Sequence, residues 1–112
     1  MKFAVPVYRG LLCAHFGHCE SFAVIEADEA TGEIRGRNDL AAPPHQPGLL
    51  PKWLAGEGVG TVIAGGMGQR ALGLFSSYGI RVITGAPAAP PEELVRRFLA
   101  GNLETGENAC DH

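Results

Sequence analysis

The stretch TVIAGGMGQRALGLFSSYG, residues 61–79, combines a strand, a turn and a helix in one continuous segment. Thr61 to Ala64 is a short apolar run, which is typical of a buried strand. Three glycines follow at positions 65, 66 and 68, and the residues after them form an apolar stripe with helical spacing. Gly79 ends that helix. This succession predicts one unit of an α/β sheet.

Strands and helices continue to alternate after this unit, and one further helix precedes it. Ile80 to Thr84 is the next strand, and the run PPEE at 90–93 starts a last helix whose apolar residues recur at helical spacing. Upstream, Leu49 to Ala55 is a short helix with Pro51 in its first turn. The N-terminal part instead predicts three strands, namely Lys2–Val7, Ser21–Ala27 and Glu33–Leu40.

The predicted order of elements is β-β-β-α-β-α-β-α within one domain, residues 1–112. Right-handed crossovers leave few arrangements. The simplest is an α/β fold of ribonuclease-H-like topology, without implying that activity. It has a five-stranded mixed sheet in the order 3-2-1-4-5, with only strand 2 antiparallel and helices on both faces. The loops after four strands then share one edge, where ligands of open α/β sheets usually bind. They are Tyr8–Glu20, Ala41–Pro47, Gly65–Gly68 and Gly85–Pro90.

Composition excludes several functional classes. The net charge of −3 argues against an electrostatic nucleic-acid partner, which usually meets a basic face. No apolar run approaches the roughly 20 residues of a membrane-spanning helix. The N-terminus has no signal-like cleavage region, so we expect a cytoplasmic protein without a membrane partner.

Metal-ligand side chains concentrate in the loop after the first strand. The heptapeptide CAHFGHC, residues 13–19, contains Cys13, His15, His18 and Cys19. His45 lies on a second loop at the same predicted edge. Thiolate with imidazole suits zinc, copper or iron–sulfur chemistry and suits magnesium or calcium poorly. Ordinary loop residues are the alternative, but four such side chains in seven positions favour a metal role.

The pattern matches no standard zinc signature, because it has neither a Cys-x-x-Cys pair nor a His-x-x-x-His pair on a helix. Cys110 and His112, near the C-terminus, could add a thiolate and an imidazole. They could equally be solvated terminal residues. The last helix is expected to end at the opposite edge of the sheet. About a dozen extended residues, spanning roughly 36–43 Å, allow a return to the ligand edge without requiring it.

The glycine turn is the second candidate site. A glycine-rich turn between a strand and a helix exposes backbone N–H groups that favour anions, here a phosphate or an anionic metal–sulfur cluster. Arg70 would add positive charge and Met67 a soft sulfur contact. The turn lacks the ending of a P-loop and the spacing of a dinucleotide motif. Gly65, Gly66 and Gly68 could alternatively serve only to bring helix and strand together.

The sequence offers little support for an enzyme. Ser21, Ser76 and Ser77 lie in no nucleophile-elbow motif, and Glu92 and Glu93 are typical acidic residues of a helix N-terminus. Asp28 and Glu29 fall on the turn at the opposite edge of the predicted sheet. We therefore expect a binding protein and not a catalyst.

Several motifs together resemble the dinitrogenase iron–molybdenum cofactor biosynthesis family, that is, the small NifX-like nitrogenase accessory proteins and the C-terminal part of NifB. They are KFAVPV, HFGHCESF, HQPGLLPKWL, VIAGGMGQRAL and the closing GENACDH, which span nearly the whole chain. The resemblance implies a ribonuclease-H-like fold that binds or carries iron–sulfur or molybdenum-containing cluster precursors. It implies a carrier or chaperone.

The resemblance also transfers to individual positions. His15, Phe16, Gly17 and His18 match the HFGH motif, and His45 matches the histidine before Pro-Gly. Gly65 to Gly68 match the glycine turn, and Cys110 and His112 resemble a C-terminal Cys-Asp-His found in many short members. Cys13 and Cys19 depart from the pattern, because relatives commonly have serine and a small or neutral residue there. Any ligand role of these two cysteines is therefore specific to this chain.

The leading hypothesis is a carrier of a metal, or of an iron–sulfur or molybdenum-containing cluster or cofactor precursor, that acts in metallocluster assembly between cluster donor and acceptor proteins. The first alternative is a small structural zinc protein. The second is an anion- or nucleotide-responsive module that works through the glycine turn and docks on a P-loop ATPase. A carrier should stay folded without its cargo, whereas a structural zinc protein should unfold when the metal is removed.

Overall fold

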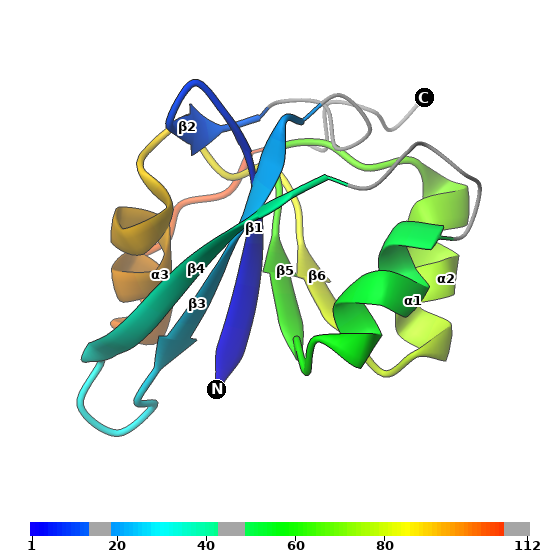
Figure 1. The fold of residues 1–112 in the computed structure, drawn as a ribbon. Helices are drawn as coiled ribbons and strands as arrows, with labels where there is room; N and C mark the ends of the chain where they lie inside the picture. Colours follow the sequence, from blue (N-terminus) through cyan, green and yellow to red (C-terminus); the bar gives the residue numbers. More distant parts are fainter. Residues whose placement is uncertain (14–18, 43–48, 107–112) are drawn as a thin grey trace.

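The computed structural model describes residues 1–13, 19–42 and 49–106, which form a mixed α/β fold with a six-stranded sheet and three helices (Figure 1). The strands are β1 (Lys2–Tyr8), β2 (Leu11–Leu12), β3 (Ser21–Ala27), β4 (Ile34–Ala41), β5 (Thr61–Ile63) and β6 (Arg81–Ile83). The helices are α1 (Leu49–Gly56), α2 (Gln69–Ser77) and α3 (Pro91–Leu99).

The main path of the sheet runs β4-β3-β1-β5-β6, which agrees with the order of neighbours predicted for the five longer strands. Strand β3 is antiparallel to both β1 and β4, whereas β1, β5 and β6 are mutually parallel. β1, β4, β5 and β6 therefore run in one direction. The ribonuclease-H-like classification remains a prediction.

The predicted count of five strands is wrong, because the loop after β1 contains the short strand β2. Arg9 and Gly10 have φ angles of 53° and 83°, and they connect β1 to β2 as a two-residue hairpin. Such hairpins need positive φ at both central residues, which Asn-Gly usually supplies. An arginine rarely adopts this conformation, so the sequence carried no recognisable hairpin signal here.

Both faces of the sheet are covered by hydrophobic clusters. Side chains alternate along β1, so Phe3 packs towards α3 with Leu94, whereas Ala4 faces the opposite cluster that includes Leu54 of α1 and Phe75 of α2. Figure 1 shows α3 on one side of the sheet and the other two helices on the opposite side. Burial on both faces explains why β1 and β5 are nearly all apolar.

The helices of this fold are short. α2 and α3 have nine residues each, a length of roughly 13–14 Å at the usual rise per residue. Within the described ranges, no helix is long and apolar enough to cross a membrane.

Candidate metal-binding edge of the sheet

Backbone hydrogen bonds join the segments at the carboxyl ends of the parallel strands. The N–H of Gly85 donates to the carbonyl oxygen of Gly65 (2.8 Å), which links the segments after β6 and β5. The N–H of Leu12 donates to the oxygen of Ala89 (3.1 Å), which links β2 to the segment before α3. The loops that follow β1, β5 and β6 thus meet at one edge of the sheet, as the topology requires. We call this the ligand edge.

Cys13 lies at this edge beside the glycine turn. Val7 pairs with β3 on one side of β1 and with β2 on the other side. β2 therefore lies on the same side of β1 as β5, which pairs with Phe3 and Ala4. The N–H of Cys13 donates to the oxygen of Pro6 at 2.8 Å, continuing that pairing. Cys13 therefore lies along the same side of β1 as β5, beyond the end of that strand, where the glycine turn begins.

Cys19 lies on the other side of the end of β1. The N–H of its neighbour Glu20 donates to the oxygen of Val7 (3.0 Å), and the side chain of Cys19 is half-buried against the cluster beneath α1 and α2. Burial, and secondarily the nearby thiol of Cys13, raise the pKa of the Cys19 thiol to about 11. The two thiols are thus close enough to interact electrostatically.

The glycine turn is buried at its start and exposed at its end. Gly65 and Gly66 are buried, and Met67 is 1 % exposed within the cluster beneath α1 and α2. Gly68 is exposed and is the N-cap of α2, without a side-chain capping bond. Arg70 is exposed in the first turn of that helix. The exposed helix N-terminus, rather than the buried glycines, is the surface that an anion could reach.

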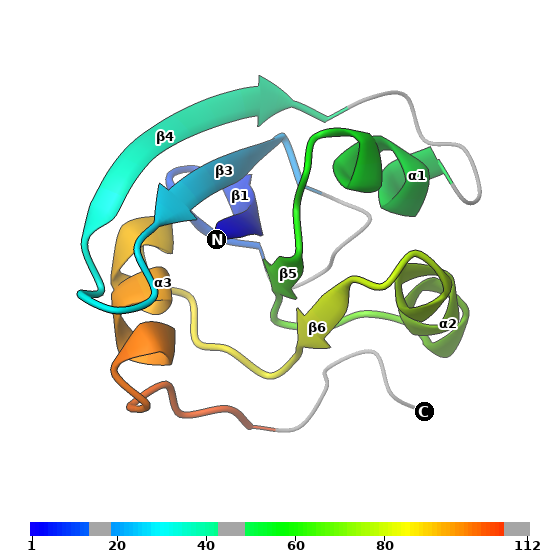
Figure 2. The same ribbon diagram turned by 90° about the horizontal axis from the view of Figure 1, so that it is seen from below.

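The C-terminal tail returns to the ligand edge, a route that the sequence allowed but did not require. Gly101, with φ of 76°, forms a Schellman turn at the end of α3, in which Asn102 donates to the oxygen of Arg97 at 2.8 Å. Leu103 then packs against the cluster beneath α3. The tail ends, within the described chain, at Gly106, whose N–H donates to the oxygen of Gly85 at 2.7 Å (Figure 2).

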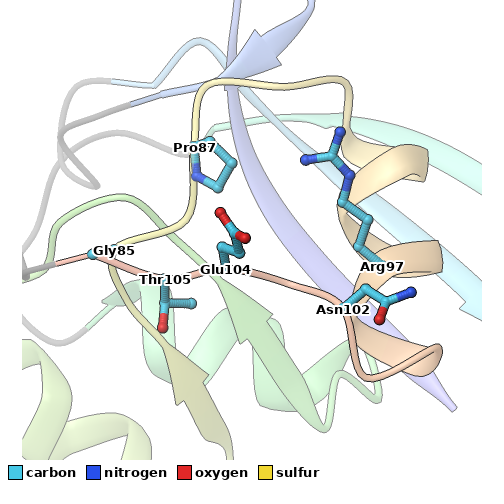
Figure 3. Close-up of a pocket in the computed structure, with 7 residues that line it drawn as sticks. Gly85, Pro87, Arg97, Asn102, Glu104 and Thr105 are labelled. Atoms are coloured by element: carbon cyan, nitrogen blue, oxygen red, sulfur yellow. The ribbon is translucent and has the colours of Figure 1, made fainter.

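A polar cavity of about 740 Å³ lies between this tail, α3 and the segment after β6 (Figure 3). Figure 3 shows the tail passing directly beside Gly85. The cavity is lined by Gly85, Pro87, Arg97, Asn102, Glu104, Thr105 and Gly106. The sequence predicted that the loop Gly85–Pro90 lies at this edge and allowed the tail to return, but none of the seven residues that line the cavity was predicted as a site residue. Two features of the sequence pointed to this arrangement. Gly85 follows a predicted strand, and Gly101 follows the last predicted helix.

Several predicted site residues lie outside the described residues, and their predicted roles stay predictions. They are His15, Phe16, Gly17, His18, His45, Cys110 and His112. Among residues 1–13, 19–42 and 49–106, no three His, Cys, Asp or Glu side chains come together as a metal-ion site. Of the predicted ligands, the described part of the chain thus contains only Cys13 and Cys19, which flank the segment that carries His15 and His18.

Comparison with known proteins identifies similar chains of nearly the same length. The uncharacterised protein MJ0580 of Methanocaldococcus jannaschii is 33% identical, over 96% of this chain and 92% of that protein. The crystal structure of PH0822 has a TM-score of 0.85 at 25% identity and covers 94% of both chains. The apo form of the orange protein of Desulfovibrio gigas has a TM-score of 0.72 at 25% identity, over 96% of this chain and 93% of that one.

The family comparison covers most of the chain. The model described as dinitrogenase iron-molybdenum cofactor matches residues 1–101, from β1 through the end of α3. This range includes both thiols of the ligand edge and the glycine turn. The chain therefore belongs to the dinitrogenase iron–molybdenum cofactor family.

Proposed function

We propose that this protein is a carrier that binds a metal–sulfur cluster as cargo at the ligand edge. The cargo class is an iron–sulfur cluster, a molybdenum-containing cluster or a precursor of either. Family membership links the chain to processes around the iron–molybdenum cofactor. In this proposal the protein receives the cluster from a donor protein and passes it to an acceptor without catalysing a reaction.

One observation carries the proposal. Cys13 and Cys19 flank the end of β1 and interact electrostatically, and Cys13 lies beside the turn that leads to the N-terminus of α2. Thiolates are preferred ligands of iron–sulfur clusters, and a helix N-terminus stabilises negative charge. His15 and His18 lie between the two cysteines in the sequence and would supply imidazole ligands.

The electrostatics of the site favour binding coupled to proton release. A cysteine must lose its proton to become a ligand, and burial makes this loss unfavourable at Cys19 in the free protein. A bound metal reverses this preference because its positive charge stabilises the thiolate. We therefore expect reversible binding, in which cluster loading and release follow the protonation of the ligands.

The proposal is tested by anaerobic reconstitution with ferrous iron and sulfide, followed by iron and sulfide analysis and visible absorption spectroscopy. His15→Ala and His18→Ala should bind sharply less cluster than the unmodified chain. Binding should also weaken as the pH falls through the histidine range near 6.5. Cys13→Ser and Cys19→Ser test the two thiols, because a hard hydroxyl is a poor substitute for thiolate on a soft metal.

The outcomes separate the carrier from its alternatives. Normal binding by all four variants would show that the ligand edge is not the cluster site. One colourless zinc ion whose removal unfolds the chain would support a structural zinc protein. Nucleotide or phosphate binding without metal dependence would support the module that docks on a P-loop ATPase. Normal binding by the two serine variants alone would assign the site to the histidines.

A further inference from the structure

The hairpin between β1 and β2 presents an exposed apolar pair. Tyr8 and Leu11 lie directly opposite each other across the hairpin, and they are 46% and 42% exposed. The Cβ atoms of such a cross-strand pair lie about 5 Å apart, so the two side chains form one continuous surface. The next pair along the hairpin, Val7 and Leu12, is buried in the cluster beneath α3. Tyr8 and Leu11 therefore lie on the opposite face of the hairpin.

The same alternation of side chains brings Cys13 to the face of Tyr8 and Leu11. The N–H of Cys13 continues the pairing of β2 by donating to the oxygen of Pro6 at 2.8 Å. Leu11 and Cys13 lie two positions apart in this extended segment, so they share a face and their Cα atoms are roughly 6.5 Å apart. A protein that covered the exposed pair would therefore lie beside a thiol of the ligand edge.

Arg9 adds a positive charge at the tip of the hairpin. Its guanidinium carbon lies 5.3 Å from the centroid of the Tyr8 ring, which is within the range of a cation–π interaction. In the part of the chain that the structure describes, no carboxylate forms a salt bridge with this guanidinium. The backbone N–H of Arg9 donates to the carboxylate of Glu20 at 2.8 Å, and φ of 53° is a strained conformation for arginine. Strain of this kind is concentrated at functional sites.

We propose that Tyr8, Arg9 and Leu11 form the docking face for the protein that accepts the cluster, and that the acceptor meets them with an apolar hollow bordered by carboxylates. The inference rests on the proposed function, because it names the partner of the same site. Tyrosine and arginine are enriched among the residues that dominate the binding energy of interfaces. An acceptor that awaits a cluster also presents ligand thiolates, whose negative charge complements the cation of Arg9.

The test measures the binding of metal-free protein to a fluorescently labelled plant-type ferredoxin with an acidic surface, which represents the acceptor after transfer. Fluorescence anisotropy gives the Kd. Tyr8→Ser and Leu11→Ser should each weaken binding about tenfold. Tyr78→Ser is the matched control, because Tyr78 is also 46% exposed but lies at the C-terminal end of α2, away from the ligand edge. This control should bind ferredoxin as tightly as the unmodified chain.

Substitution of Arg9 separates recognition from folding. Arg9→Gly removes the charge and places a glycine in a conformation that glycine adopts readily, so the urea midpoint should not fall. Binding to ferredoxin should nevertheless weaken about fivefold, and it should depend less on salt than binding by the unmodified chain. Arg9→Lys keeps the positive charge and should retain most of the affinity and of its salt dependence.

Equal affinities of the unmodified chain, Tyr8→Ser and Leu11→Ser would overturn the inference, as would absence of ferredoxin binding. A lower urea midpoint of Arg9→Gly with unchanged affinity would also overturn it, because the arginine would then serve the fold alone. Sedimentation is the further measurement. Self-association that Tyr8→Ser abolishes would assign the face to a second copy of the chain and would contradict the proposal.

These measurements use metal-free protein, so they are independent of cluster reconstitution. A chain that binds ferredoxin through Tyr8, Arg9 and Leu11 but takes up no cluster would retain the docking face and lose the proposed function. A chain that takes up a cluster but binds no ferredoxin would retain the proposed function and lose the docking face.

Discussion

Arg37 of β4 forms a salt bridge with Glu92 of α3, although 55 positions separate them in the sequence. Arg37 also pairs with Asp39 at 2.7 Å, and its pKa is raised mainly by that hydrogen bond, with Glu92 contributing. The arginine thus connects the edge strand of the sheet to the helix that covers the neighbouring face. Both side chains are partly exposed, so solvent and salt weaken the attraction.

Replacing Arg37 by alanine should therefore lower the free energy of unfolding by about 0.5–1 kcal/mol. Urea denaturation should show this loss at low ionic strength and a smaller one in about 1 M salt. Arg35→Ala is the control, because Arg35 is 60% exposed and pairs with Asp28 in the adjacent turn. An effect of Arg35→Ala as large as that of Arg37→Ala would contradict a stabilising link between β4 and α3.

The thiol of Cys19 should react slowly near neutral pH. Burial, and secondarily Cys13, raise its pKa from 9.0 to about 11, and only the thiolate is the nucleophile. Alkylation of Cys19 by iodoacetamide, followed by mass spectrometry, should accelerate with pH up to about 11. A midpoint near that of a free thiol would show that the site is not desolvated. Cys13→Ser should lower the midpoint only in part, because burial is the larger cause.

The same shift predicts the pH dependence of stability. The folded-state pKa of Cys19 lies above its ordinary value of 9.0, so the unfolded chain loses this proton first. Its contribution to stability should be complete below pH 9 and should decline as the pH rises towards 11. The Cys19→Ser variant should lack this part of the loss of stability at alkaline pH. Thermal unfolding of the variant and of the unmodified chain over this pH range provides the comparison.

The fold should persist without metal. Hydrophobic clusters cover both faces of the sheet, and they include Phe3 and Leu94 on one face and Phe22 and Phe75 on the other, all fully buried. These contacts need no bound ion, and a relative has the same fold in an apo form. Treatment with a chelator should leave a cooperative thermal transition in circular dichroism. Its disappearance would favour the structural zinc protein.

Substitution at the N-terminus of α2 should weaken cluster binding more than it lowers the stability of the fold. Gly68 has φ of −68°, and an added Cβ would meet nothing within 4 Å, so Gly68→Val should fold normally. A bulky side chain there would keep an anionic cluster away from the helix N-terminus. We expect cluster binding to weaken by about tenfold, equivalent to roughly 1.4 kcal/mol.

Gly36→Val on β4 is the control for this substitution, since an added Cβ there also meets nothing within 4 Å and the position lies away from the ligand edge. Titration of both reconstituted variants, with urea denaturation of the apo forms, provides the comparison. If Gly68→Val lost stability and binding together, the turn would have an architectural role only.

The sequence alone was sufficient for the main elements of the fold, because each has a local signal. Continuous apolar runs mark β1 and β3, and helical periodicity with terminal Gly or Pro marks the three helices. The handedness of crossovers then leaves few strand orders, so the convergence of the loops after β1, β5 and β6 at one edge was predictable. The group of two cysteines and two histidines could also be recognised from the sequence, because all four lie within residues 13–19.

Tertiary structure alone decided three features of the site. The hairpin to β2, which brings Cys13 next to the glycine turn, depends on Arg9 in a conformation that arginine seldom adopts. Burial of Cys19 depends on packing against a cluster assembled from distant elements. The return of the tail depends on the hydrogen bond between Gly106 and Gly85, which lie 21 positions apart in the sequence. None of these has a local periodic signal, because each arises from contacts between segments that the chain brings together only on folding.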